Sequence, residues 1–167
     1  MSEVAPKILM VAEAPGYRGM RLTGVPFTSP SLVRTGLDDF ELFGEARGYR
    51  SPAEHGHIQK EQSGTIVWQT LRDNKALPLI WNAFPFHPHL PGKPLSNRTP
   101  TAKELEMGLP FLRDMIALFE IEAVVAIGNK AFDSLARLGF SCEKVRHPAQ
   151  SGKNQFVEGV CRILQKP

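Results

Sequence analysis

Three short apolar runs stand out along the chain, at Ile8–Val11, Leu79–Ala83 and Ala123–Ile127. Each is a largely continuous apolar run that does not alternate with polar residues, which is typical of strands covered on both faces. A shorter run, Cys142–Val145, predicts a fourth strand. The stretches between them carry apolar residues at helical spacing, and they predict helices over Ser31–Leu42, Gly64–Arg72, Thr101–Phe119, Asn129–Leu138 and Lys153–Gln165.

Strands that alternate with helices predict an α/β fold, a three-layer sandwich in which helices flank a central four-stranded, mostly parallel sheet. The longest predicted helix has a start signal, because Thr101 followed by Glu104 fits a capping box. A chain of 167 residues suits one domain, so we expect residues 1–167 to fold as a single domain.

The segments that directly follow the strands are where a ligand site is expected, because open parallel sheets bind ligands outside the carboxyl ends of their strands. These segments are Ala12–Ser29, Phe84–Arg98, Gly128–Lys130 and Arg146–Asn154. The stretch Gly44–Gly64 is rich in polar residues, glycine and proline, and it predicts a mobile surface loop.

Composition narrows the class of protein without naming a function. Hydrophobic residues make up 42% of the chain and charged residues 22%, an ordinary soluble balance. The net charge of +3 permits contacts with nucleic-acid phosphates but does not require them. The two cysteines, Cys142 and Cys161, form no metal or redox motif, and no signal peptide or long apolar run is present. We therefore expect a cytoplasmic protein with free thiols and no membrane partner.

The stretch EAPGYRGMRLTGVPFTS, residues 13–29, places a carboxylate in a glycine-rich loop behind the first strand. In a partly dry cleft, Glu13 would polarise a water molecule or face a developing positive charge; as an ordinary loop residue it would cap nearby amides. Phe27 follows Pro26 at the far end of this loop. Its ring would either stack on a flat base or fill the core.

Asn82 lies where the second predicted strand ends, and His147 follows the fourth. Together with Glu13 they are expected at three adjacent strand ends of one sheet. The Asn82 amide carries donors and an acceptor that suit the edge of a pyrimidine, although a buried asparagine can equally serve loop carbonyls. His147 precedes Pro148, which favours an extended backbone, and its imidazole could donate to an oxygen that gains negative charge. A solvated surface histidine is the other interpretation. His87 and His89 lack a third metal ligand at convincing spacing.

The order of these motifs resembles that of the uracil-DNA glycosylase superfamily over nearly the whole chain. Two motifs are similar to those of the family-four enzymes, EAPG at 13–16 and NRTPTAKELEMGLPFL at 97–112. Two others are similar to motifs of the single-strand-selective monofunctional branch, GMRLTGVPF at 19–27 and NAFPFHP at 82–88. AIGNKAF at 126–132 and HPAQSGKN at 147–154 match the remaining landmarks.

The resemblance implies a role for each matching residue. Glu13 would activate water or support the positively charged sugar, and His147 would stabilise the departing uracil anion. Asn82 would read the uracil edge, Phe27 would lie beneath the base, and Ala14 and Gly16 would line its pocket. The last motif would press into DNA as the base flips out, which assigns DNA contacts to Pro148, Ser151, Lys153 and Asn154.

Departures from the family pattern carry further expectations. Family four holds an iron–sulfur cluster on four cysteines. Here Gly108 takes one of those places, and the chain has two cysteines in all. We therefore expect no cluster, no metal and no other cofactor. Gly16 stands where the uracil-specific first family carries a tyrosine that excludes thymine, so the pocket would admit other bases. Ala149 removes a hydroxyl from the last motif.

Three functions follow as hypotheses. The first is a monofunctional DNA glycosylase that removes uracil or a related deaminated base and leaves an abasic site. The second is a glycosylase for hypoxanthine, xanthine or 5-modified uracil. The third is a nucleic-acid or nucleotide-binding member of the superfamily with little catalysis. In each case the partner would be DNA, or a nucleotide, and the protein is expected to be a monomer.

Overall fold

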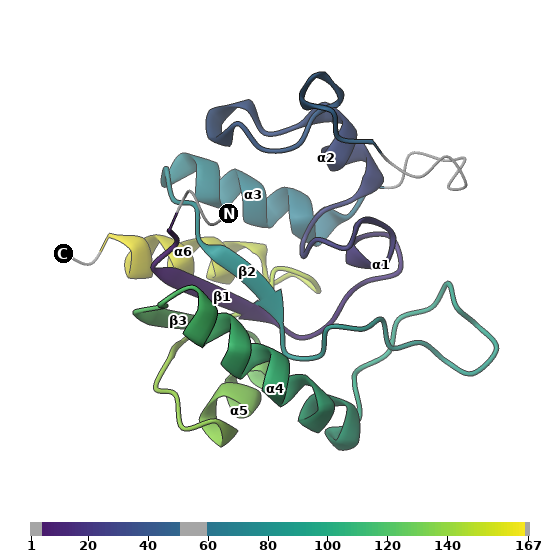
Figure 1. The fold of residues 1–167 in the computed structure, drawn as a ribbon, viewed down its shortest axis with the longest axis vertical. Coiled ribbons are helices and arrows are strands. Elements are labelled where there is room, and N and C mark those ends of the chain that lie inside the picture. The colour runs from purple at the N-terminus through teal and green to yellow at the C-terminus, as the bar shows by residue number, and fades with distance from the viewer. Residues whose placement is uncertain (1–4, 51–59, 166–167) are drawn as a thin grey trace.

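A four-stranded sheet forms the centre of the molecule (Figure 1). The computed structural model describes residues 5–50 and 60–165. The strands are β1 (Ile8–Ala12), β2 (Leu79–Asn82), β3 (Ala123–Ile127) and β4 (Glu143–Val145). They lie in the order β2-β1-β3-β4, and every pair is parallel. The predicted α/β sandwich is confirmed, with an all-parallel sheet.

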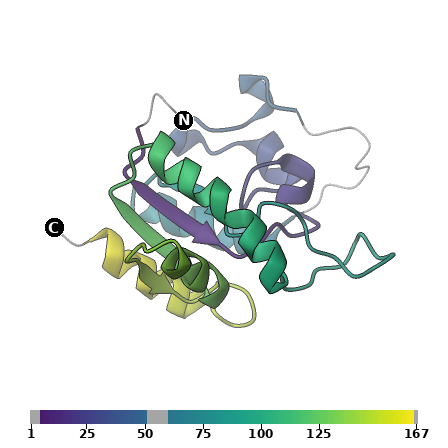
Figure 2. The same ribbon diagram turned by 60° about the horizontal axis from the view of Figure 1, so that its bottom comes forward.

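Helices cover both faces of this sheet (Figures 1 and 2). On one face lie α3 (Gln62–Asp73) and α6 (Lys153–Leu164), and on the other lie α4 (Ala102–Leu118) and α5 (Asn129–Arg137). Alternate residues of β1 enter the two cores: Met10 packs in the first, Leu9 in the second. Because both faces of the strand are covered, its sequence is continuously apolar.

The segment after β1 differs from the prediction. One helix was expected over Ser31–Leu42, but α2 (Pro30–Thr35) ends at Gly36, whose φ of +81° no other residue type adopts easily. The chain then forms the 3-10 turn η1 (Asp38–Phe40), which is closed by a hydrogen bond from the Leu37 N–H to the Leu42 carbonyl oxygen at 2.7 Å. The short helices α1 (Met20–Thr23) and η2 (Glu45–Arg47) were not predicted.

The predicted loop Gly44–Gly64 is only partly described. Residues 51–59 lie outside the described residues, and α3 begins at Gln62, two residues before the predicted start. Within the part of the chain that the structure describes, no helix combines the length and apolar character needed to cross a membrane.

Two helices rest directly on loop backbone through glycines. A Cβ at Gly64 of α3 would collide with the carbonyl oxygen of Phe27, and a Cβ at Gly108 of α4 would collide with the carbonyl oxygen of Ala83. Phe27 ends the glycine-rich loop and Ala83 directly follows β2. The glycines therefore set how closely α3 and α4 approach the carboxyl edge of the sheet.

The replacement Gly108→Ala tests this close approach. Alanine in a helix interior normally stabilises a protein by about 0.5–1 kcal/mol relative to glycine. Here the added methyl has no room, and we expect the free energy of unfolding to fall by about 1–3 kcal/mol. Urea unfolding gives the value, with Lys103→Ala at an exposed site of the same helix as the matched control. A Gly108→Ala variant more stable than the wild type would contradict the packing.

Candidate active site

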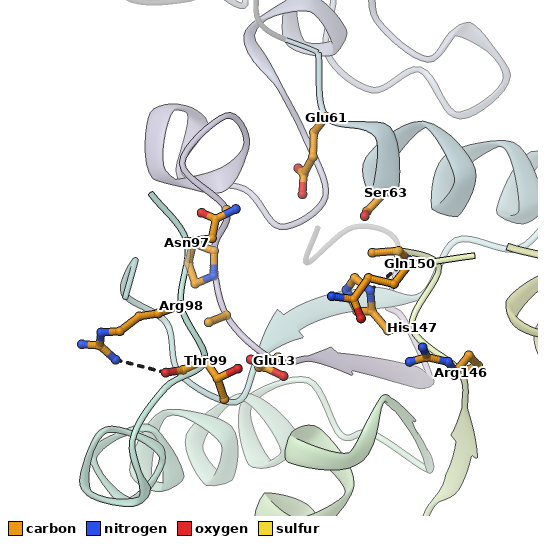
Figure 3. A pocket seen from close by; sticks show the side chains of 13 residues that line it. Glu13, Glu61, Ser63, Asn97, Arg98, Thr99, Arg146, His147 and Gln150 are labelled. Carbon is orange, nitrogen blue, oxygen red and sulfur yellow. Dashed lines mark hydrogen bonds between the residues drawn. The ribbon is translucent and has the colours of Figure 1, made fainter. Parts of the chain in front are cut away.

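A cleft of about 450 Å³ lies at the carboxyl edge of the sheet (Figure 3). Its walls come from the segments that follow β1, β2 and β4 and from the start of α3. At its inner end is a recess of about 30 Å³ that Met20, Phe27 and Asn82 help to line. The cleft and recess are continuous, because both are lined by Ala14, Pro15, Gly16, Glu61 and His147.

The strand order corrects one detail of the predicted site. The ends of β1 and β2 are neighbours, but β3 separates β1 from β4, so the three strand ends that carry the predicted residues are not all adjacent. His147 nevertheless lines the cleft, and it lies beside Gly128, the residue that directly follows β3. A Cβ at this glycine would lie 3.7 Å from the His147 Cβ.

Glu13 lies directly after β1, on the floor of the cleft (Figure 3). Its backbone carbonyl accepts a hydrogen bond from the Phe84 N–H at 3.0 Å, which extends the pairing of β1 with β2 and fixes the loop. Burial raises the pKa of its carboxyl group above the ordinary value, while a hydrogen bond with Thr99 and the charge of Lys130 act in the opposite direction. The carboxyl group is thus partly buried, and one donor and one cation favour its charged form.

His147 has a defined tautomer. The Ala149 N–H donates to His147 Nδ1 at 3.1 Å, so Nδ1 is the acceptor of the ring and the proton of the neutral imidazole is on Nε2. Burial, followed by the positive charge of Arg146, holds the pKa of His147 below its ordinary value. At neutral pH the side chain is therefore a neutral donor at the cleft.

Phe27 and Asn82 lie together at the recess, as predicted. Phe27 is buried with a φ of +53°, and its carbonyl oxygen accepts from Trp68 Nε1 at 3.1 Å. Its ring centroid is 6.2 Å from that of His147. Asn82 is buried, and its Nδ2 donates to the Met20 sulfur at 2.8 Å. Phe27 both fills the core and borders the recess, so the two interpretations of this residue are compatible.

Glu61 is the main residue that the sequence did not predict. It directly precedes α3, and its side chain extends into the cleft from the side opposite Glu13 (Figure 3). Its Oε2 is buried and has no hydrogen-bond partner among the described residues. Burial raises its pKa to about 7. No sequence motif marks this residue, because it follows a polar segment without periodicity.

Asn97 and Arg98 also line the cleft without having been predicted. Asn97 Oδ1 accepts from the Tyr17 N–H at 3.0 Å and lies 3.2 Å from His87 Nε2, which ties the loop after β1 to the loop after β2. Arg98 donates two hydrogen bonds of 2.7 Å to the Glu104 carboxylate, which also caps α4. Its guanidinium group therefore anchors the loop.

The four residues predicted to contact DNA lie outside the cleft lining. Ser151, Lys153 and Asn154 are exposed, and DNA contact stays a prediction for them. Pro148 is buried, so the structure does not present it to DNA as the motif implied. The loop itself is tightly wound, with positive φ at Gln150 and Ser151. Ala149, Gln150 and Arg146 are the residues of this segment that line the cleft beside His147.

The residues present do not fit an iron–sulfur cluster. At Gly108, where family four has a cysteine ligand, contact with Ala83 leaves no space for any side chain. Cys142 packs beside the core between the sheet and α4, whereas Cys161 accepts from Asn74 Nδ2 at 3.2 Å on α6. His87 and His89 stack at 5.6 Å, but no group of three metal-ligating side chains occurs among residues 5–50 and 60–165.

Comparison with known families gives one match. A model of the uracil DNA glycosylase superfamily matches residues 1–164 of the chain. No curated protein matches the chain in a sequence search.

The raised pKa of Glu61 predicts a pH-dependent stability. Between pH 4.5 and about 7 the folded protein keeps a proton on Glu61 that the unfolded chain has lost, so the free energy of unfolding falls as pH rises through this window. Glu61→Gln should remove this dependence. Its free energy of unfolding should therefore rise relative to that of the wild type by up to about 3 kcal/mol between pH 4.5 and pH 8. Urea unfolding across this range is the measurement. The exposed Glu158→Gln should follow the wild type, and a pH-independent difference for Glu61→Gln would refute a neutral Glu61.

Proposed function

The chain belongs to the uracil DNA glycosylase superfamily, and on this premise we propose that it is a monofunctional DNA glycosylase. The proposed reaction is hydrolysis of the N-glycosidic bond of uracil or a related deaminated base in DNA, which leaves an abasic site. Members of the superfamily are DNA glycosylases, so family membership supports hydrolysis of an N-glycosyl bond in general. The finer proposal depends on the site.

The observation that carries the proposal is the placement of Glu13 and His147 on one cleft with a recess at its inner end. When the bond between the base and C1′ breaks, its electron pair leaves with the base and positive charge develops on the sugar. A catalyst for this step needs a negative group near the sugar and a hydrogen-bond donor near the base. Glu13 and the Nε2–H of His147 supply this pair.

The protonation states of both groups suit these roles. Thr99 and Lys130 oppose the effect of burial on Glu13 and so favour its carboxylate, which would face the charged sugar and accept a proton from the attacking water. The oxygen of that water becomes the C1′ hydroxyl. His147 is neutral because its pKa is lowered, so it stabilises the anionic base by donating a hydrogen bond and carries no charge of its own.

The inner part of the cleft would hold the flipped base, with one edge of the base at the recess, because the recess alone has room for about one water molecule. Phe27 presents a buried aromatic ring at the wall of the recess, and Asn82 presents an amide. A ring face suits stacking, and an amide suits the alternating donors and acceptors on a pyrimidine edge. Glu13 lines the cleft but not the recess, so a base with its edge at the recess would place the sugar in the part of the cleft that Glu13 borders.

Excision from defined oligonucleotides tests the proposal. Single- and double-stranded oligonucleotides with one uracil, hypoxanthine or xanthine are incubated with the protein, and strand breaks are measured with and without alkali. We expect breaks that need alkali, as for an abasic product, at the uracil. Glu13→Gln and His147→Ala should each slow excision by about 10²- to 10⁴-fold while retaining DNA binding.

Glu158→Gln, at an exposed position of α6, is the matched control and should keep wild-type activity. Excision of hypoxanthine or xanthine in place of uracil would change the proposed substrate. Binding of all three oligonucleotides without any excision would instead identify a binding protein and refute the glycosylase proposal.

A further inference from the structure

We propose that Glu61 contacts the bound base and donates a hydrogen bond to one of its ring carbonyls. This inference rests on the proposed function, because it assigns a further substrate contact to the same recess. It concerns a residue that no motif of the sequence marked and that enters the site from α3, the helical layer opposite α4.

The backbone around Glu61 leaves space for its carboxyl group. The nearest atom to a Cβ built on Gly16 would be Glu61 Oε1, at 3.6 Å, and a Cβ on Gly19 would collide with Oε2. Gly16 and Gly19 belong to the loop that follows β1. The absence of a side chain at Gly19 therefore makes room for the carboxyl group, which lies in ordinary contact distance of Gly16.

The same contact changes the expected shape of the pocket. The lack of a side chain at Gly16 predicted an open space beside the base, but Glu61 Oε1 lies next to this glycine. Glu61 also lines both the cleft and the recess, together with His147. A base in the inner cleft, with its edge at the recess that Phe27 and Asn82 line, would therefore lie beside the Glu61 carboxyl group.

The buried oxygen of Glu61 lacks a partner in the described part of the molecule. A buried polar atom without a hydrogen bond is destabilising, so a rotation of this carboxyl group toward an acceptor on a bound base would recover that free energy on binding. A neutral carboxyl group needs an acceptor for its proton, and a ring carbonyl is such an acceptor. Deamination replaces an exocyclic amine with a carbonyl, so this contact favours deaminated bases.

Among residues 5–50 and 60–165, no nearby charge keeps Glu61 ionised. The other charged or titratable side chains of the cleft are Glu13, Arg98, Arg146 and His147, one or more from each loop that borders it. Arg98 is paired with Glu104, and burial alone raises the pKa of Glu61, to about 7. Below this pH the neutral carboxyl group donates; above it, a carboxylate would face the carbonyl oxygen and repel it.

The pH dependence of excision tests this contact. Single-turnover excision of uracil by the 167-residue chain is measured from pH 5.5 to 8.5 for the wild type, Glu61→Gln, Glu61→Ala and the control Glu158→Gln. We expect the wild-type rate to fall about tenfold per pH unit above pH 7, where the neutral form is lost. Glu61→Gln keeps a donor at every pH and should lose this decline, because an amide does not ionise there.

The other variants separate a contact from a structural or proton-transfer role. Glu61→Ala should be slower than Glu61→Gln, on the order of tenfold, at pH 6 because it has no donor. A wild-type profile that is flat from pH 6 to 8.5 would overturn the inference. So would inactivation of Glu61→Gln, which would indicate proton transfer. If the wild-type profile is flat or Glu61→Gln is inactive while Glu13→Gln has lost excision, the proposed function stands and only the Glu61 contact is refuted.

A binding measurement tests the contact without turnover. The pKa of the Glu61 carboxyl group is followed by carbon NMR of protein labelled at glutamate, with and without free uracil, and Glu61→Gln assigns its signal. Because the neutral form should bind the base better, saturating uracil should raise this pKa. An unchanged pKa at saturation would overturn the contact even if the enzyme excises uracil.

Discussion

The site depends on the contact between helix backbone and loop backbone at the carboxyl edge of the sheet. Gly64 brings α3 against the carbonyl of Phe27, while Trp68, one turn further along the same helix, donates to that carbonyl. The contact holds Phe27 in a left-handed conformation and places Glu61, three residues before Gly64, beside the loop that follows β1. A longer side chain at position 64 would move the helix, the aromatic ring and the carboxyl group together.

Two glutamates share the cleft, and burial raises the pKa of both carboxyl groups. At Glu13 a donor, Thr99, and a cation, Lys130, act against burial, whereas among the described residues no such group acts on Glu61. In the proposed roles, this difference in environment separates a carboxylate that faces the charged sugar from a carboxyl group that donates a hydrogen bond.

The sheet and the helical layers were predictable because their residues carry strong local signals. The apolar runs of β1 and β3 and the capping box at Thr101 need no tertiary information. The placement of Glu13, Asn82 and His147 on the cleft was also predictable, since each ends or follows a strand and matches a family motif. The placement of Glu61 was not, because it depends on space left by Gly19, some 40 residues earlier. The end of α2 at Gly36 was missed for another reason, because the apolar spacing continues past this glycine into the turn that hydrogen bonds between Leu37 and Leu42 close.

The contact of Gly108 with Ala83 also limits how this scaffold can be redesigned. Introducing a metal-binding thiol at position 108 requires the axis of α4 to move away from the sheet, and that displacement would carry Arg98 with it through Glu104. An engineered cluster would therefore come with a reshaped cleft wall. A thiol at position 108 therefore cannot be introduced by substitution alone and needs a coordinated change of helix position.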